Sequence, residues 1–261
     1  MDAQRFAGRV AVITGSTADP SIGRACAFRL AREGASVVVN GRNEDRVRAT
    51  EAALHAEGLA AVGVVGSMEA EPAVAMLLDR AVRAFGRIDL VVSTLGGAPY
   101  PRPFDAITEA QLLETIRLNT WPAVALVQAA LGRGLGDDHN GSVVVISSGS
   151  PHKTTSAMVS YASAKAALNA LTRTIASDLA GRVRVNAVSP GLVRTTATKG
   201  IWEADDGAGA GANLPVGRLT DADDVAAAVC FLLSDDARQI TGVALDVDGG
   251  NHLKSGWTPI R

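Results

Sequence analysis

Hydrophobic residues in this chain fall into two alternating patterns. Short runs of β-branched and aliphatic residues, almost without polar interruption, are typical of strands buried on both faces of a parallel sheet. The longer segments between them space apolar residues three or four positions apart, which is typical of helices that cover such a sheet. Strands are predicted at residues 9–14, 35–40, 61–65, 88–93, 141–147, 183–189 and 242–247. Helices are predicted near residues 22–33, 44–57, 70–85, 109–131, 160–180 and 221–233.

This alternation predicts an α/β protein with a doubly wound parallel sheet of seven strands, the Rossmann fold. Ligands of such sheets bind in the crevice beyond the carboxyl ends of the strands. No linker, repeat or block of charge divides the chain, so residues 1–261 are predicted to form one domain. Residues 204–213 (ADDGAGAGAN) are too rich in glycine to be expected as a packed element. Residues 196–215 are expected to cover the substrate as a lid.

Composition and charge narrow the function classes. The chain is 47% hydrophobic and 20% charged, so it can bury a sizeable core. Its net charge of −2 and pI near 6.1 argue against a nucleic-acid or anionic-membrane surface. Cys26 and Cys230 lie apart in apolar helical segments, so neither a disulfide framework nor a metal site is expected. With no membrane-spanning run and no signal-peptide pattern, we expect a cytoplasmic protein that acts on a small molecule.

The segment TGSTADPSIG (14–23) follows the first predicted strand and opens the first predicted helix. Gly15 can turn tightly at the strand end, and Ser21 and Ile22 lead into a helix whose free N–H groups can hold a pyrophosphate. Gly23 lets the helix and the strand approach closely. Glycines that serve only loop geometry are the competing interpretation, but a turn that follows a first buried strand favours phosphate binding.

Tyr161 and Lys165 are four positions apart in the predicted helix 160–180, which places them on one face, one turn apart. A phenol with its ordinary pKa of about 10 is too weak an acid for proton transfer near neutral pH. The neighbouring ammonium is expected to lower that pKa. Ser148, at the end of the preceding strand, can hydrogen-bond the oxygen that the tyrosine protonates. Alone, this spacing is usually an ordinary amphipathic pair, so the interpretation depends on the other motifs.

Taken together, these motifs resemble the short-chain dehydrogenase/reductase family across essentially the whole chain. Ser148 precedes Tyr161 by 13 residues, the spacing that this family shows. The resemblance implies a catalytic tetrad of Asn119, Ser148, Tyr161 and Lys165. Tyr161 would exchange a proton with the carbonyl or alcohol oxygen, and Ser148 would bind and polarise that oxygen. Lys165 would hold the nicotinamide ribose, and Asn119 would support a proton relay through water.

Asn119 needs a separate argument, because an asparagine within a helix is usually an ordinary surface residue. Pro122 has no N–H for the carbonyl of Leu118, so the helix is expected to kink close to Asn119. This kink favours the role that the resemblance implies.

The end of the second strand, VVVNGRNEDR (37–46), concerns the choice of cofactor. Relatives that prefer NAD carry an acid just after this strand, which binds the adenosine ribose. Here Gly41 takes that place and Arg42 follows, and a guanidinium suits a 2′-phosphate by shape and charge. A surface ion pair of Arg42 with Glu44 or Asp45 is the alternative. The sequence favours NADP(H) over NAD(H).

The glycine loop departs from the family pattern T-G-x-x-x-G-x-G, since it is two residues longer and Ser21 replaces the middle glycine. This layout is similar to that of the enoyl-acyl-carrier-protein reductases, and it requires Asp19 to point away from the pyrophosphate. The family's N-N-A-G after the fourth strand is here S-T-L-G, so the supporting hydrogen bonds should be rearranged. The cofactor-binding residues that the resemblance implies are Gly15, Ser21, Ile22, Gly23, Arg42, Ser67, Met68, Gly96, Tyr161, Lys165, Pro190, Gly191, Val193 and Thr195.

The motifs are compatible with three functions. The first is an NADP(H)-dependent oxidoreductase that interconverts a carbonyl and a secondary alcohol, with a ketone or 3-oxoacyl substrate. The second is an enoyl-thioester reductase, suggested by Ser21, although three residues separate Tyr161 from Lys165 here and six are usual in that branch. The third is a catalytically silent, nucleotide-binding regulatory protein. The resemblance also implies a homotetramer or homodimer, and Trp202 is expected either to contact the substrate or to pack.

Overall fold

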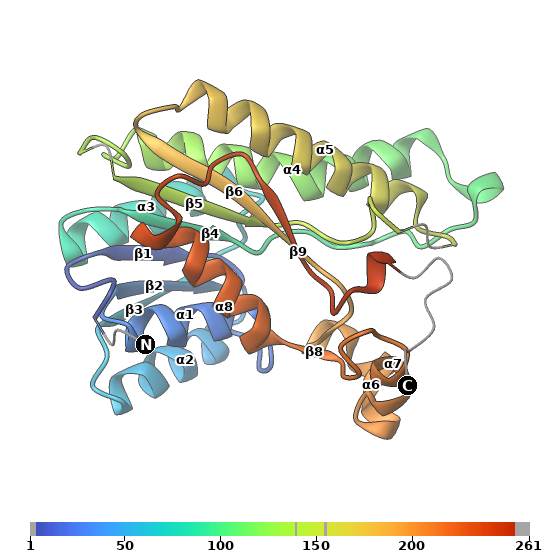
Figure 1. Cartoon of the computed structure of the whole chain (residues 1–261). Helices are drawn as coiled ribbons and strands as arrows, with labels where there is room; N and C mark the ends of the chain where they lie inside the picture. Colours follow the sequence, from blue (N-terminus) through green and yellow to red (C-terminus); the bar gives the residue numbers. More distant parts are fainter. Residues whose placement is uncertain (1–3, 139, 154–155, 254–261) are drawn as a thin grey trace.

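A computed structural model describes residues 4–138, 140–153 and 156–253 (Figure 1). Within these residues, seven parallel strands form one sheet in the order β3-β2-β1-β4-β5-β6-β9, which confirms the predicted fold class. The order reverses at β1, which lies between β2 and β4, so the crevice for a ligand is expected there. The strands are β1 (Val10–Ile13), β2 (Ser36–Gly41), β3 (Ala61–Val65), β4 (Leu90–Ser93), β5 (Gly141–Ile146), β6 (Val183–Pro190) and β9 (Ala244–Val247).

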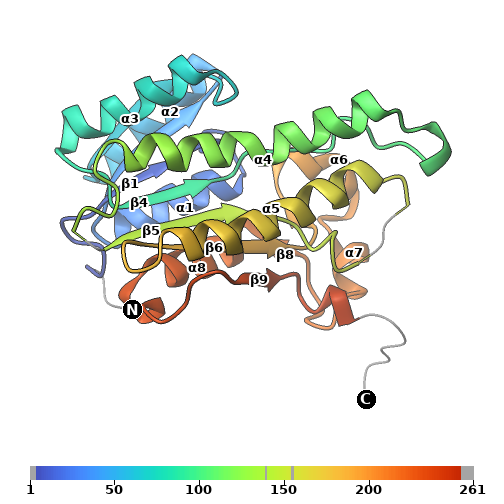
Figure 2. The same ribbon diagram turned by 90° about the horizontal axis from the view of Figure 1, so that it is seen from above.

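Helices cover both faces of the sheet, as Figure 1 shows. One buried cluster joins α1, α2 and α8 to one face, and a second joins α3, α4 and α5 to the other. α4 and α5 pack against each other along their lengths (Figure 2). Both faces of the five inner strands are thereby removed from water, which explains their almost continuous hydrophobic sequence. On the edge strands, Val65 of β3 and Leu245 of β9 stay partly exposed. The helices are α1 (Ile22–Arg32), α2 (Glu44–Ala56), α3 (Glu71–Phe85), α4 (Glu109–Leu131), α5 (Val159–Asp178) and α8 (Ala222–Leu233).

Local sequence sets several helix ends. Thr108 begins α4 with a capping box, in which its side chain and that of Gln111 each accept a backbone N–H of the other residue. Asn43 caps α2 by accepting the N–H of Arg46 at 2.9 Å. Gly86 ends α3 in the left-handed region, with φ of 81°, which suits a residue without a side chain.

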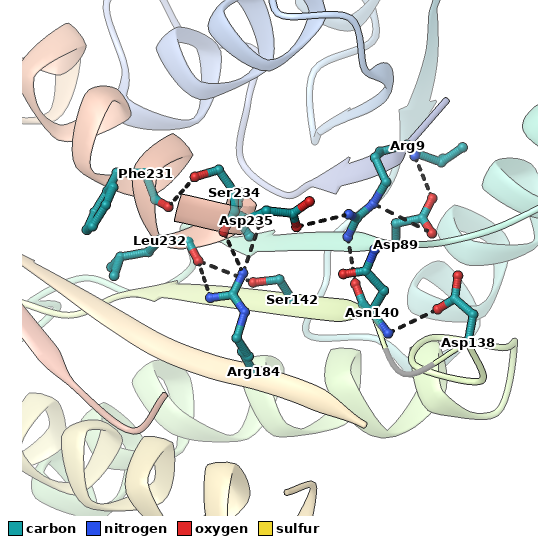
Figure 3. Close-up of polar contacts among 12 residues, drawn as sticks. Arg9, Asp89, Asp138, Asn140, Ser142, Arg184, Phe231, Leu232, Ser234 and Asp235 are labelled. Atoms are coloured by element: carbon teal, nitrogen blue, oxygen red, sulfur yellow. Dashed lines mark hydrogen bonds and ion pairs between the residues drawn. The ribbon is translucent and has the colours of Figure 1, made fainter. Parts of the chain in front are cut away.

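Polar side chains join the elements at the amino ends of the strands (Figure 3). Asp89 is 2% exposed and accepts the N–H of Val10 at 2.8 Å, which links the starts of β1 and β4. Arg9 donates to the carbonyl of Asn140 at 2.6 Å. From β6, Arg184 donates to the last carbonyls of α8, which have no partner within the helix: Leu232 at 2.6 Å, Leu233 at 3.1 Å and Ser234 at 3.0 Å. These hydrogen bonds hold β1, β4, β6 and α8 together at the amino ends of the strands and so stabilise the fold.

The expectation that residues 204–213 are not packed is wrong. They lie among short helices, α6 (Lys199–Trp202) and α7 (Ala208–Ala212), beside the short pair β7 (Val193–Arg194) and β8 (Thr220–Asp221). A Cβ on Gly207 would lie 2.6 Å from a methyl group of Leu219, and one on Gly211 would lie 2.6 Å from the backbone nitrogen of Leu219. The glycines are therefore contact positions of a packed element. Composition alone does not distinguish this from a loose loop.

Gly211→Ala should destabilise the fold, because the added methyl group meets rigid backbone at Arg218 and Leu219. Such overpacking costs about 1–3 kcal/mol, which lowers the melting temperature by about 2–4 °C for each kcal/mol in a chain of this size. Gly200→Ala is the matched control, because a Cβ at Gly200 has no atom within 4 Å. Thermal unfolding by circular dichroism measures both. Equal melting temperatures for the two variants would contradict the packing of this segment.

Candidate active site

A cleft of about 830 Å³ opens at the carboxyl ends of β1, β2, β3 and β4. Its volume is in the range of small-ligand sites, and it lies at the switch in strand order. Five of the predicted cofactor-binding residues line it: Gly15, Arg42, Ser67, Met68 and Gly96. The cleft therefore lies where the sequence predicts the adenosine and phosphate part of a dinucleotide.

The turn after β1 is closely packed. Gly15 has φ of +59°, and a Cβ on it would lie 2.5 Å from the hydroxyl oxygen of Thr94. A Cβ on Gly23 would lie 2.5 Å from the carbonyl oxygen of Gly15, so α1 approaches the turn as the sequence predicts. Both positions require glycine, the first for conformation and the second for space. The turn after β1 and the start of α1 are therefore packed directly against each other.

Ser21 is the N-cap of α1, where its hydroxyl oxygen accepts the N–H of Arg24 at 3.2 Å. Ile22 is the first residue of the helix. Asp19 lies on the exposed side of the turn, 68% exposed and 3.5 Å from the guanidinium of Arg24. The aspartate is thus paired outside the turn, which agrees with the expectation that it points away from a pyrophosphate.

Two residues hold this end of the cleft together: Thr94, within the altered S-T-L-G segment, and Asn40, which the sequence analysis did not single out. Thr94 donates its hydroxyl to the carbonyl of Thr14 at 2.7 Å, and its N–H donates to the hydroxyl of Thr14 at 3.1 Å. Asn40, 2% exposed, donates to the carbonyls of Val64 at 3.2 Å and Gly66 at 3.1 Å. These bonds join β1 to β4 and β2 to β3. They form the rearranged support that the altered loop after β4 predicts.

Arg42 and Arg46 both line the cleft just beyond β2. Among the described residues, Arg42 makes no ion pair, while Glu44 pairs with Arg48 one turn along α2. The alternative that Arg42 serves a surface ion pair with Glu44 or Asp45 is therefore not supported. This leaves positive charge facing the cleft, where a phosphate would be attracted.

Tyr161 and Lys165 lie on one face of α5, as their spacing predicts. The ammonium nitrogen of Lys165 is 5.7 Å from the centre of the Tyr161 ring and donates to the carbonyl of Ile146 at 2.9 Å. It also borders Gly96, where a Cβ would lie 2.9 Å from it. Because Gly96 lines the cleft, this contact places the Lys165 ammonium directly behind a residue of the cleft wall.

The pKa of Tyr161 departs from the expectation. Burial raises the pKa of the phenol, and interaction with the Ser148 hydroxyl opposes this rise without cancelling it. Burial also lowers the pKa of Lys165 to about 8. The predicted lowering of the tyrosine pKa by the lysine is therefore wrong for this structure. The physical reason is that removal of the phenolate from water outweighs its stabilisation by neighbouring groups.

Ser148 follows β5 and is held by Ser150, which the sequence analysis did not single out. The hydroxyl oxygen of Ser148 accepts the N–H of Ser150 at 3.1 Å and lies 2.9 Å from its hydroxyl oxygen. The loop itself is fixed to β6, since Gly149 donates its N–H to the carbonyl of Pro190 at 2.8 Å. The repeated serine in Ser-Gly-Ser was the only signal available, and it is common in ordinary turns.

Asn119 is 2% exposed, so it is not a surface residue. Its side-chain oxygen accepts the N–H of Gly97 at 3.0 Å, and its nitrogen donates to the carbonyl of Gly97 at 2.8 Å. This reciprocal pair fixes the loop after β4 next to Gly96. α4 continues through Pro122, which lines the cleft together with Leu118.

The chain after β6 crosses towards the turn that precedes α1. A Cβ on Gly191 would lie 2.9 Å from the Cβ of Asp248, so this position requires a small residue. Thr196 donates its N–H to the carbonyl of Pro20 at 2.9 Å. Trp202 donates its indole N–H to the carbonyl of Thr195 at 3.0 Å, so the packing alternative for Trp202 is supported. Val193, in β7, is buried.

Comparison with known proteins decides the family. A family model described as "Enoyl-(Acyl carrier protein) reductase" matches residues 15–252. The human dehydrogenase/reductase SDR family member 4 is 35% identical over 247 residues, which cover 94% of this chain and 88% of that protein. The chain belongs to the short-chain dehydrogenase/reductase family. As in its relatives, the enzyme is an NAD(P)-dependent oxidoreductase acting on CH–OH and C=O groups.

Other similar proteins include two reductases and a solved dehydrogenase. Tropinone reductase-like 3 of Erythroxylum coca is 36% identical over 257 residues, covering 96% of this chain and 95% of that protein. The 3-oxoacyl-[acyl-carrier-protein] reductase of Haemophilus influenzae is 32% identical over 260 residues, covering 94% and 99%. A solved 7α-hydroxysteroid dehydrogenase, complexed with NADH and 7-oxo glycochenodeoxycholic acid, superposes with a TM-score of 0.87 at 31% identity, covering 95% of this chain and 96% of that one. No helix among the described residues is long and apolar enough to cross a membrane.

Replacement of Lys165 should change how stability depends on pH. Between pH 8 and 10.5, the unfolded chain binds more protons at Lys165 than the folded chain does, so wild-type stability rises with pH in that window. Relative to Lys165→Met, the wild type should therefore gain up to about 3 kcal/mol between pH 7 and pH 10.5.

Denaturant unfolding at a series of pH values measures this gap. Lys199→Met is the control, because Lys199 is exposed and pairs with Glu203 at 2.9 Å. A gap between wild type and Lys165→Met that stays constant with pH would show that the Lys165 ammonium is not buried at a cost.

Proposed function

We propose that this protein is an NADP(H)-dependent oxidoreductase that interconverts a carbonyl and a secondary alcohol, with a ketone or 3-oxoacyl compound as substrate. The observation that carries the proposal is the position of Tyr161 and Lys165. The ammonium of Lys165 lies beside Gly96, which lines the same cleft as Arg42, and the centre of the Tyr161 ring lies 5.7 Å from that ammonium. A proton donor and a cation for a phosphate beside one cleft are what a dinucleotide-dependent reduction requires.

The residues around the cleft fit a nicotinamide dinucleotide. The start of α1 offers backbone N–H groups to a pyrophosphate, Gly15 forms the turn that leads to it, and Gly96 has no side chain where the backbone borders the cleft. When bound, the cofactor supplies or accepts the hydride. The residues proposed to hold it are Gly15, Ser21, Ile22, Gly23, Arg42, Ser67, Met68, Gly96, Tyr161, Lys165, Pro190, Gly191, Val193 and Thr195.

Each tetrad residue has a proposed task. Tyr161 gives its phenolic proton to the substrate oxygen during reduction and removes one during oxidation. Ser148 binds the same oxygen, and Ser150 keeps the Ser148 hydroxyl in place through the bonds described above. Lys165, protonated below its pKa of about 8, holds the nicotinamide ribose. Asn119 fixes the loop at Gly97 and supports a proton relay to the lysine.

Carbonyl chemistry is favoured over enoyl reduction by the three residues between Tyr161 and Lys165, and by relatives named as tropinone and 3-oxoacyl reductases. Enoyl-thioester reduction is the second candidate, since the matching family model carries that description and Ser21 caps α1. A catalytically silent regulatory protein is not supported, since the chain belongs to a family of oxidoreductases. We further propose a cytoplasmic homotetramer or homodimer, which light scattering after gel filtration would test.

Tyr161→Phe should bind cofactor but lose turnover by about 10²–10⁴-fold, because proton transfer by a placed side chain contributes that much. Loss of absorbance of the reduced cofactor, followed against a panel of ketones and enoyl thioesters, measures turnover and separates the first two candidates. Tyr100→Phe is the matched control, since the hydroxyl of Tyr100 donates to the carboxylate of Glu114 at 2.6 Å, at the surface. Full activity in Tyr161→Phe would refute the proposed role. Turnover of enoyl thioesters but of none of the ketones would favour enoyl reduction instead.

Arg42→Ala should weaken binding of NADPH by about 10–100-fold, because a charge-assisted hydrogen bond contributes about 1.5–3 kcal/mol. Binding of NADH should change little, because NADH has no 2′-phosphate. Quenching of tryptophan fluorescence measures both affinities. Arg48→Ala, which removes a guanidinium from α2 that pairs with Glu44 instead, should affect neither. Equal losses for NADPH and NADH in Arg42→Ala would contradict the assigned role of Arg42.

A further inference from the structure

Gly41 has no conformational reason to be glycine. It is the last residue of β2 and pairs in register with Val65 of β3. Its backbone does not lie in the left-handed region, where an ordinary side chain would be strained. The reason for glycine at this position must therefore be the space around it.

The side chain of Thr17 fills that space. A Cβ on Gly41 would lie 2.1 Å from the hydroxyl oxygen of Thr17, and 3.1 Å from both its Cβ and its methyl carbon. Real Cβ atoms do not approach other heavy atoms to 2.1 Å, so a side chain on Gly41 and the present position of Thr17 exclude each other. Thr17 and Gly41 both line the cleft.

Thr17 cannot easily move aside. The turn that carries it is joined to β2 through Ser16, which donates its N–H to the carbonyl of Asn40 at 2.8 Å. The hydroxyl oxygen of Ser16 also accepts the N–H of Asn40 at 2.9 Å. Thr17 is 8% exposed, and its β-branched side chain has few rotamers available. The turn is therefore held by the residue immediately before Gly41.

Position 41 is where an acid would bind the adenosine ribose of NAD, by the general rule for dinucleotide folds. We propose that Thr17 is a specificity-determining residue, because it denies this position to an acidic side chain and so leaves the guanidinium groups of Arg42 and Arg46 as the charges that the end of β2 and the start of α2 present to the cleft. The inference rests on the proposed preference for NADP(H). It adds that two elements set the preference together, the turn after β1 and the end of β2.

A stability cycle tests the steric part without any cofactor. Gly41→Ala should lower the melting temperature by several degrees in the wild type and by about 1 °C or less in a Thr17→Gly background, because glycine at 17 removes all three contacting atoms. Gly132→Ala is the control, since a Cβ at Gly132 meets only ordinary contacts at 3.6 Å and beyond. Equal costs of Gly41→Ala in the two backgrounds, or no cost in the wild type, would overturn the inference.

A binding cycle tests the specificity part. Gly41→Asp should weaken both NADPH and NADH in the wild type, because the turn is displaced. In the Thr17→Gly background, the same change should shift the ratio of the two dissociation constants at least tenfold towards NADH. An equal shift of that ratio in both backgrounds would show that Thr17 does not control it. A Gly41→Asp variant that folds in the Thr17→Gly background but not in the wild type would support the exclusion, and one that folds in neither background would overturn it.

The proposed preference itself can fail independently of this inference. A wild-type protein that binds NADH as tightly as NADPH would refute the preference for NADP(H). The dependence of the Gly41→Ala cost on residue 17 would still show whether the two positions exclude each other.

Discussion

Close packing around four glycines near the carboxyl ends of β1, β2 and β4 is the constraint on which the site depends. At Gly15, Gly23, Gly41 and Gly96, an added Cβ would lie within 2.5 Å of another atom. At Gly15 the backbone conformation also requires glycine, whereas at Gly23 and Gly41 the constraint is space alone. The four contacts bring the turn after β1, the end of β2 and the loop after β4 together around one cleft. The sheet positions these segments. The absence of side chains at the four glycines leaves room for the side chains of Thr94, Thr17 and Asn119 and for the carbonyl of Gly15.

Burial of the Lys165 ammonium lowers the stability of the fold. Lys165 is 2% exposed, and its ammonium donates to a carbonyl rather than to a carboxylate. An ammonium removed from water without an opposite charge is unfavourable, and the lowered pKa reflects this. Folds commonly tolerate such a cost where chemistry needs the group. In this protein, the buried hydrophobic clusters on both faces of the sheet offset the cost of burying the Lys165 ammonium.

The sequence predicted all seven strands of the sheet, because their hydrophobicity depends only on burial between two layers of helices. It also predicted that Tyr161 and Lys165 share a helix face, since spacing alone decides this. It did not predict Asn40, Thr94 or Ser150, because their hydrogen bonds join residues whose proximity only the fold determines. The packing of Gly207 and Gly211 was missed for the same reason. The direction of the Tyr161 pKa depends on burial, which a single sequence does not report.

The polar contacts of Arg184 (Figure 3) lie at the amino end of β6, whereas the cleft lies at the carboxyl ends of the strands. β5 has six residues, so at about 3.3 Å per residue its ends are roughly 15–20 Å apart. Substitutions separated by more than about 7–10 Å usually have additive effects on the free energy of unfolding. Losses caused by remodelling the cleft can therefore be repaired by improvements at the amino ends of the strands, with no change to the geometry of the cleft. Residues that shape the cleft and residues that stabilise the fold therefore lie at opposite ends of the sheet.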